Sequence, residues 1–373
     1  MTGNTSPHLE SRRKLFSTIP VPAHKGASMS QRLMSLATLV FATLIASSAM
    51  PCSRFLWNNK LGVFVARTMD WPESTEPILT VLPRGMARDG GKLGSEVIVK
   101  ENPARWTSKH GSMVTTMYGL GTIDGFNEKG LGVHLLYLSA TDFGPRDTAR
   151  PAVHAGLWGQ YLLDNCATVK EALDAFNAIQ VVMAEARGHK ANLHLAMEDT
   201  SGDSAVIEFI NSKPVIHHGK QYRIMTNDPT YDEQLALLSR LDFSKPTSDT
   251  PLPGNVKATD RFQRIAYFSA LLPEPKNERE AVASAIAIAR NVSVPFGAPY
   301  KNFGIYNTEY RTVINLTNLR YYFELTTSPN VIWADLSRFD LKPGAPVMVL
   351  NPYEGDLCGN VSEKFYKAVK APF

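Results

Sequence analysis

The order of strand-like and helix-like segments constrains the fold of this chain more than any other feature. From residue 52 onward, the sequence predicts strands, then helices, then strands, helices and strands again. A parallel sheet needs a crossover, usually a helix, between successive strands, so this order does not fit a doubly wound fold. The order favours an α+β protein with antiparallel sheets and helices segregated on the outside.

Alternating and helical periodicities place the individual segments. Strands are expected over 53–57, 61–68, 76–82, 95–101, 111–119, 130–140, 192–199, 204–210, 213–219, 221–228, 308–326 and 331–337. Turn residues at Asp124-Gly125 and over 127–130 are expected to separate the strands at 111–119 and 130–140. Helices are expected over 154–165, 168–179, 231–241, 260–272 and 277–290.

The positive charge of the chain lies in its first 51 residues. The formal charge of the 373 residues is +4, and residues 1–51 alone carry five basic side chains and one acidic side chain. The remainder is therefore neutral, which argues against a nucleic-acid-binding protein. The hydrophobic share of 44% is that of a soluble globular protein and excludes a largely disordered chain.

Residues 1–51, which we call the leader, contain the succession of segments that is typical of a secretory signal peptide. A basic residue after Met29 is followed by an apolar run over 36–45 and small residues over 46–49. The run is too short to span a bilayer; the alternative is a buried or amphipathic helix. We expect residues 1–51 to be a signal peptide with a short propeptide, Met29 being a possible true start. Residues 52–373 then form one domain of a periplasmic or secreted protein.

Cys52 follows this leader directly. A cysteine at a mature N-terminus combines a thiol nucleophile with its own α-amine as the adjacent base. The alternatives are a lipid-carrying cysteine of a non-catalytic envelope binding protein and a buried strand cysteine. In an oxidising compartment Cys166 and Cys358 could pair, which the sequence leaves open. A hairpin over 53–68 would bring Arg67 and Asp70 next to Cys52, where Arg67 could hold a thiolate and Asp70 could bond the α-amine.

Five segments in order resemble one family. They are similar to segments of the choloylglycine hydrolase family, which includes bile salt hydrolases and penicillin V acylases. The five segments are CSRF with ARTMDW, GTIDGFNEKGLGVHLLYLSAT, MTNDPTYDEQL, DRFQRIAYF and TEYRTVINLTNLRYYFELT. The resemblance implies an N-terminal-nucleophile (Ntn) hydrolase αββα sandwich of two antiparallel sheets covered by helices. It also implies hydrolysis of linear amides and a homotetramer. One departure from the family pattern is Met50-Pro51 between the expected cleavage point after Ala49 and Cys52; we expect autoproteolytic removal of these two residues, with a direct cut before Cys52 as the alternative.

The resemblance also implies roles for single residues. Cys52 matches the nucleophile, and Arg67 and Asp70 match the pair beside it. Asn227 matches the residue whose amide helps to form the oxyanion hole, and Arg261 matches a late active-site arginine. Each of these residues could instead serve structure alone, Asn227 as a turn residue and Arg261 as a solvated helix residue.

Substrate preference depends on aromatic residues. Tyr137 stands where bile salt hydrolases tend to have Asn, and Trp71 follows Asp70. Both favour the penicillin V acylases. The secretory leader resembles that of the Gram-negative members, which act on phenoxyacetyl amides and long-chain acyl-homoserine lactones; bile salt hydrolysis is the alternative. Trp71 with Leu135 or Phe143 could line an apolar acyl pocket. The proposed chemistry uses neither metal nor cofactor, and the sequence has no HExxH pattern.

Overall fold

A hairpin at the start of the body forms the middle of the fold. The computed structural model describes residues 52–299 and 306–373. Strand β1 (Cys52–Asn59) pairs with β2 (Gly62–Trp71), and Cys52 lies opposite Met69. Both strands are almost wholly buried, and the polar residues Arg54, Arg67 and Asp70 are buried with the apolar ones. The expected N-terminal hairpin is confirmed, and the predicted leader lies outside the described residues.

Two large sheets are built around this hairpin. In the described residues, the first sheet holds seven strands in the order β18 (Ile224–Met225), β1, β2, β19 (Asn307–Asn315), β20 (Arg320–Leu325), β21 (Ile332–Asp335) and β23 (Gly359–Asn360). All neighbours in it are antiparallel except β21 and β23.

The second sheet is antiparallel throughout. Among the described residues it holds nine strands, in the order β17 (Lys213–His218), β16 (Ser204–Ile210), β15 (Leu193–Glu198), β10 (Gly132–Tyr137), β9 (Gly121–Asn127), β8 (Ser112–Met117), β3 (Ile78–Leu82), β22 (Met348–Leu350) and β24 (Tyr366–Lys367). Four short ribbons complete the strands: β4 (Ala87–Asp89) with β7 (Arg105–Thr107), β5 (Lys92–Leu93) with β6 (Glu96–Val97), β11 (Ala152–His154) with β12 (Gln180–Val182), and β13 (Glu185–Ala186) with β14 (His189–Lys190).

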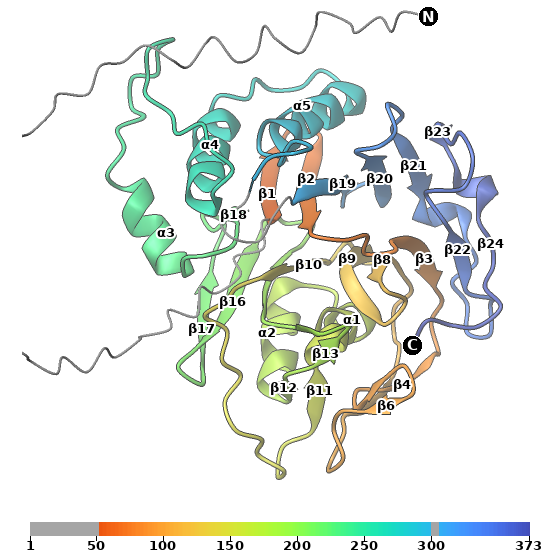
Figure 1. Ribbon diagram of the computed structural model, residues 1–373. Coiled ribbons are helices and arrows are strands. Elements are labelled where there is room, and N and C mark those ends of the chain that lie inside the picture. The colour runs from red at the N-terminus through yellow and green to blue at the C-terminus, as the bar shows by residue number, and fades with distance from the viewer. Residues whose placement is uncertain (1–51, 300–305) are drawn as a thin grey trace, which may run out of the picture. The chain divides into compact units, whose positions relative to one another are not determined.

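Helices cover both outer faces. Figure 1 shows α4 (Ala258–Ala270) and α5 (Glu278–Asn291) on the side of β1 and β2, and α1 (Ala155–Asn165) and α2 (Val169–Asn177) beyond β9 and β10. Helix α3 (Tyr231–Leu238) precedes α4 and packs against it, and short 3-10 turns lie at Leu336–Arg338 and Ser362–Lys364. The layers are helix, sheet, sheet, helix, as the αββα expectation required.

The structure corrects several sequence expectations. The segment 308–326, expected as strand throughout, is the antiparallel hairpin of β19 and β20. The strand expected over 95–101 is wrong, since only Glu96–Val97 pair and Val97 is exposed. The strand expected over 221–228 shrinks to Ile224–Met225. Asp124-Gly125 is not a turn but the middle of β9, where a Cβ on Gly125 would lie 2.5 Å from the Met113 carbonyl oxygen of β8. The glycine there permits close strand approach.

Candidate active site

The thiol of Cys52 is buried between the two sheets. Its Sγ lies 3.9 Å from Arg67 Nη2 and 3.8 Å from the backbone oxygen of Asp70. Arg67 Nη1 donates to the backbone oxygen of Ile123 at 3.0 Å, and this bond ties the guanidinium to the second sheet. Hairpin pairing therefore places a cation beside the thiol, as the spacing of Cys52 and Arg67 predicts.

Two opposing effects act on this thiol. Burial raises the pKa of Cys52, and the positive charges of Arg67 and Arg261 oppose that rise while the Asp70 carboxylate adds to it. In the full chain a residue precedes Cys52, so its nitrogen is a peptide amide. Cleavage before Cys52 would convert that nitrogen into an amine, next to the sulfur.

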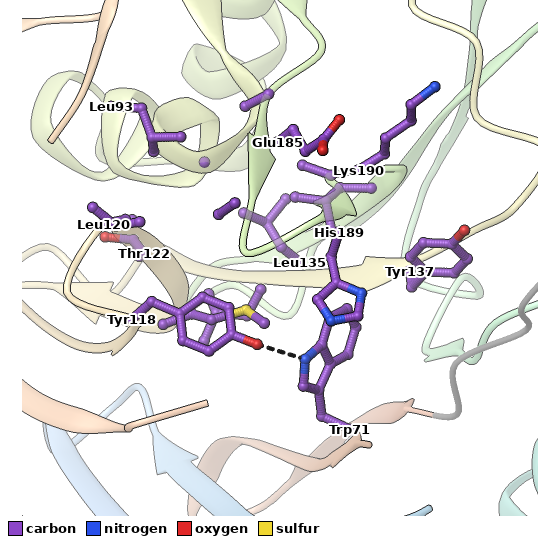
Figure 2. Close-up of a pocket in the computed structure, with 18 residues that line it drawn as sticks. Trp71, Leu93, Tyr118, Leu120, Thr122, Leu135, Tyr137, Glu185, His189 and Lys190 are labelled. Carbon is purple, nitrogen blue, oxygen red and sulfur yellow. Dashed lines mark hydrogen bonds between the residues drawn. The ribbon is translucent and has the colours of Figure 1, made fainter. Parts of the chain in front are cut away.

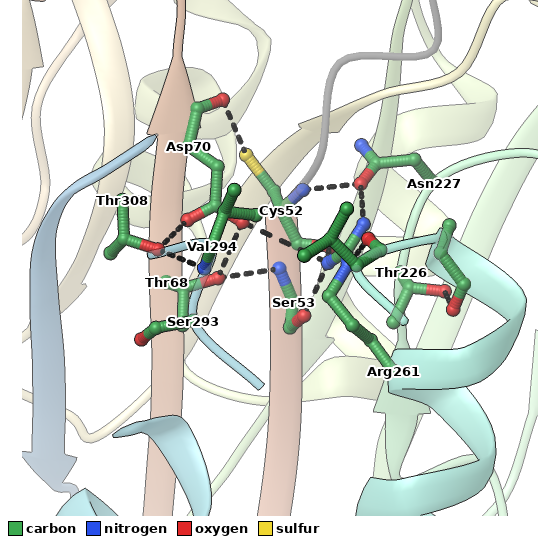
Figure 3. Close-up of polar contacts among 12 residues, drawn as sticks. Cys52, Ser53, Thr68, Asp70, Thr226, Asn227, Arg261, Ser293, Val294 and Thr308 are labelled. Carbon is green, nitrogen blue, oxygen red and sulfur yellow. Dashed lines mark hydrogen bonds and ion pairs between the residues drawn. The ribbon is translucent and has the colours of Figure 1, made fainter. Parts of the chain in front are cut away.

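Asn227 and Arg261 hold the backbone of Cys52 (Figure 3). Asn227 lies just after β18, and its Oδ1 accepts from the Cys52 backbone nitrogen and, at 3.0 Å, from Arg261 Nη2. Arg261, on α4, also donates through Nη1 to the Cys52 backbone oxygen and to Ser53 Oγ. Asn227 Nδ2 donates to the backbone oxygen of Tyr137 at 2.7 Å. Both side chains are buried, so the solvated and turn-only interpretations do not describe them.

Asp70, at the end of β2, lies close to Arg261 and to the hydroxyl groups around Cys52. Its carboxylate accepts from Thr68 Oγ1 at 3.1 Å and from Thr308 Oγ1, and its Oδ2 lies 3.9 Å from Arg261 Nη1. Burial raises the pKa of Asp70, and the charge of Arg261 opposes that rise. In the unprocessed chain the Cys52 amide nitrogen donates to Asn227 Oδ1, and Asp70 contacts the surrounding hydroxyls and Arg261. A bond from Asp70 to the α-amine of a processed Cys52 stays a prediction.

An apolar cavity adjoins the group (Figure 2). It has a volume of about 80 Å³, and its lining includes Trp71, Ile123, Leu135 and Tyr137. Trp71 directly follows Asp70, and the Tyr137 backbone oxygen accepts from Asn227. Two residues of the cavity lining are therefore joined to residues that surround Cys52. Phe143, which the sequence offered as a lining residue, packs instead against Phe209 and lines a different hollow.

Hydrogen bonds and ring contacts connect Trp71 with the other residues at one side of the cavity. Trp71 Nε1 donates to Tyr118 Oη at 2.8 Å, and Tyr118 Oη donates to Glu73 at 2.6 Å. The ring of His189 from β14 meets Trp71 edge-on, with centroids 5.3 Å apart. The Arg187 guanidinium lies 4.2 Å from the centre of the Tyr118 ring. These contacts hold the β13–β14 hairpin against the strand that carries Asp70.

Sequence reasoning missed a second set of buried charged residues behind Arg67. Arg54, Asp124, His134 and Glu198 are all fully buried between the sheets. The available signal was the presence of charged residues inside otherwise apolar strands, where an unpaired charge is costly.

Cysteines and candidate metal ligands are dispersed over the described part of the chain. Its three cysteines, Cys52, Cys166 and Cys358, are free, so the possible Cys166–Cys358 bond is not formed. Within 52–299 and 306–373, no three His, Cys, Asp or Glu side chains converge as a metal site would require. Over the same ranges, no helix combines the length and apolarity needed to cross a membrane.

Two facing sheets between helices, with a thiol at the start of the central hairpin, define the class of Ntn-hydrolase folds. The sequence matches the linear amide C–N hydrolases of the choloylglycine hydrolase family over residues 52–357. It is 34% identical over 366 residues to a penicillin V acylase of Pectobacterium atrosepticum, an alignment that spans 90% of this chain and 95% of the relative.

Solved structures of the same family resemble the fold of this chain. Penicillin V acylase from Agrobacterium tumefaciens superposes with a TM-score of 0.76 at 38% identity, over 85% of this chain and 98% of that chain. A mutant of conjugated bile acid hydrolase from Clostridium perfringens gives a TM-score of 0.69 at 20% identity, over 82% of this chain and 98% of that chain, and shares the fold. The chain therefore belongs to the choloylglycine hydrolase family, and it is an amidohydrolase that acts on linear amides.

Proposed function

We propose that this enzyme cleaves acyl amides with Cys52 as its nucleophile and passes through a thioester. The observation that carries the proposal is one buried thiol, 3.9 Å from the Arg67 guanidinium. Ile123, whose backbone oxygen binds Arg67, lines an apolar cavity nearby. A cation stabilises a thiolate, and an apolar cavity binds an acyl group. Penicillin V and long-chain acyl-homoserine lactones are the proposed substrate classes.

The proposed step needs a base next to the sulfur. Processing before Cys52 releases its α-amine, which takes the proton of the thiol as the sulfur attacks the carbonyl carbon. The carbon–nitrogen bond then breaks, and the α-amine gives that proton to the departing amine. Water attacks the thioester, the acid leaves, and the thiol regains its proton. Asn227 and Arg261 keep the nitrogen of Cys52 in place through the hydrogen bonds described above.

The oxyanion of the tetrahedral intermediate needs donors. We assign this role to Asn227 Nδ2, together with the hydroxyl or backbone nitrogen of Tyr137. Asn227 Nδ2 already donates to the Tyr137 backbone oxygen, so one of its two hydrogens is committed and the other can serve the oxyanion. A donor of this kind is worth about 10²–10³ in rate.

Processing and location follow from the leader. We propose that residues 1–51 direct export to the periplasm or the medium and are then removed, with the Met50-Pro51 step as self-processing. The assembly proposed is a homotetramer, in keeping with the family resemblance. Cys52 would then be the first residue of the active enzyme rather than a site of lipid attachment.

A comparison of four substrates tests the substrate class. One enzyme preparation in matched buffers should give a higher kcat/KM for penicillin V or a long-chain acyl-homoserine lactone than for glycocholate or taurocholate. The neutral body offers no overall field for anionic bile conjugates, and the cavity is lined by apolar and aromatic groups. If either bile salt exceeds both other classes by about tenfold, bile salt hydrolysis replaces the proposal.

A matched pair of variants locates the acyl group. Trp71→Ala should raise KM for penicillin V, because Trp71 lines the cavity. Phe143→Ala removes an aromatic ring of the same sheet region outside the cavity, and we expect it to leave KM unchanged. Equal effects of the two substitutions would contradict binding of the acyl group in this cavity.

A further inference from the structure

A row of alternating charges runs through the interior and ends at Cys52. It consists of Arg54, Glu198, His134, Asp124 and Arg67, which we call the charge row. All five side chains are buried in strands of the two facing sheets. Burying five charged side chains costs much free energy unless each charge faces one of opposite sign. The alternation of signs along the row provides such neighbours.

His134 is held by a carboxylate at each ring nitrogen. Its Nε2 lies 2.7 Å from Glu198 Oε1, and its Nδ1 contacts Asp124 Oδ1. An ionised carboxylate accepts hydrogen bonds only, so both ring nitrogens must carry hydrogen and the ring is an imidazolium. Burial alone would lower the pKa of His134, but the carboxylates of Glu198 and Asp124 outweigh burial and raise it.

The two carboxylates are ionised as well. Burial would raise the pKa of Glu198, but the charges of Arg54 and His134 outweigh burial and lower it. Arg54 Nη2 donates to Glu198 Oε2, which closes the far end of the row. Burial likewise opposes ionisation of Asp124, yet His134 and Arg67 lower its pKa.

Hydroxyls from the first sheet fix the near end of the row. Asp124 Oδ2 accepts from Thr312 Oγ1 at 2.8 Å and from Tyr321 Oη at 2.6 Å. Tyr310 also lies near Arg67, and burial raises the pKa of both Tyr310 and Tyr321 well above the ordinary value, so both stay neutral. The Tyr321 phenol orients Asp124, and neither phenol changes the charge balance.

The balance of the row is uneven. With His134 protonated it contains three cations and two carboxylates, which leaves one positive charge in excess. Near the sulfur, Asp70 and Arg261 are of opposite sign and compensate each other. The excess charge is therefore balanced when the Cys52 thiol, next to Arg67, becomes a thiolate.

We propose that His134 is a positioning residue for the nucleophile: as an imidazolium it supplies the unbalanced positive charge that favours the Cys52 thiolate. With a neutral residue at position 134, the two arginines and two carboxylates of the row would balance, and the row would favour a negative sulfur less strongly, although Arg67 would stay beside it. The importance of this effect for catalysis rests on the proposed function of Cys52, but its influence on the thiol does not.

Alkylation of Cys52 measures the effect directly. The rate of iodoacetamide modification is followed against pH by peptide-resolved mass spectrometry, in the purified full-length protein and in His134→Gln. At pH values below the thiol pKa, the variant should react roughly tenfold more slowly, which corresponds to a rise of about one pKa unit. Arg54→Met removes the cation at the far end, and the thiol should again react more slowly, by a smaller factor.

A matched histidine provides the control. His194, in β15 of the same sheet, is buried and lies 3.1 Å from Glu208 through Nδ1, outside the charge row. His194→Gln therefore disturbs a similar buried pair and should leave the alkylation profile of Cys52 unchanged. Equal shifts in His134→Gln and His194→Gln would show a general packing effect and overturn the proposal.

A second measurement needs no substitution. In the ¹⁵N spectrum of histidine-labelled protein at about pH 9, well above the ordinary histidine pKa, an imidazolium signal that is absent from His134→Gln should remain. A spectrum without an imidazolium overturns the proposal, as does a folded His134→Gln or Arg54→Met whose alkylation profile matches the native protein. Should Cys52→Ser keep full activity, the proposed function fails, yet the alkylation result still decides the role of His134.

Discussion

The contacts of Asn227 allow a sharp test of its role. Its side chain accepts from the Cys52 nitrogen and Arg261 and donates to the Tyr137 backbone oxygen. Asn227→Ala removes all of these bonds, and leaving buried partners unpaired costs about 1–3 kcal/mol for each. We expect a lower melting temperature and a fall in kcat of about 10²–10³, equivalent to roughly 3–4 kcal/mol of transition-state stabilisation.

Asn227→Asp separates the two ends of the amide. An aspartate keeps an oxygen for the Cys52 nitrogen and for Arg261 and loses the donor to Tyr137, while its negative charge faces the Arg261 guanidinium. If the donor serves the oxyanion, kcat for penicillin V should fall in both variants, with much smaller changes in KM. Steady-state kinetics on folded protein provide the measurement. A near-native kcat in Asn227→Asp would refute the oxyanion role and leave Asn227 as a support for Cys52.

Two further predictions concern the nucleophile and a buried histidine. Cys52→Ser should fold but lose nearly all turnover, since a hydroxyl beside Arg67 is a far weaker nucleophile than a thiol. The control variants Cys166→Ser and Cys358→Ser should keep the native kcat. Turnover near the native rate in Cys52→Ser would contradict the assignment of Cys52 as nucleophile. Burial lowers the pKa of His154 from 6.5 to about 4. The unfolded chain therefore binds a proton first, and stability should decrease by about 3 kcal/mol as the pH falls from roughly 6.5 to 4. His154→Gln should lack this part of the acid sensitivity in denaturant unfolding at each pH, and an unchanged slope would count against it.

Short-range patterns predicted much of this fold. The hairpin from Cys52, six of the nine strands of the second sheet and all five helices of the described residues follow from alternation, helical periodicity and turn residues, whereas β9, β22 and β24 were not expected. The thiol and Arg67 come together because antiparallel pairing fixes their register, which the sequence spacing encodes directly. Local rules suffice wherever the partner lies nearby in the chain.

Long-range placement was harder to predict. Asp124-Gly125 has the composition of a turn, yet the glycine serves a close contact between strands. The charge row joins five strands across two sheets, and no sequence spacing reveals such pairing. The contact between Asn227 and the Cys52 nitrogen was not foreseen for the same reason, since Asn227 reaches it from 175 residues away. Tertiary packing decides these contacts, and residue type alone suggests only that buried charges need partners.

Acid-quenched peptide mapping during turnover would identify the nucleophile itself. Active enzyme is mixed with penicillin V, quenched within the first turnovers and digested, and the acylated peptide is sequenced by mass spectrometry. We predict a phenoxyacetyl group on a peptide whose first residue is Cys52, with no such adduct in Cys52→Ser. An acyl group on another residue, or active enzyme in which residues still precede Cys52, would contradict the proposed mechanism.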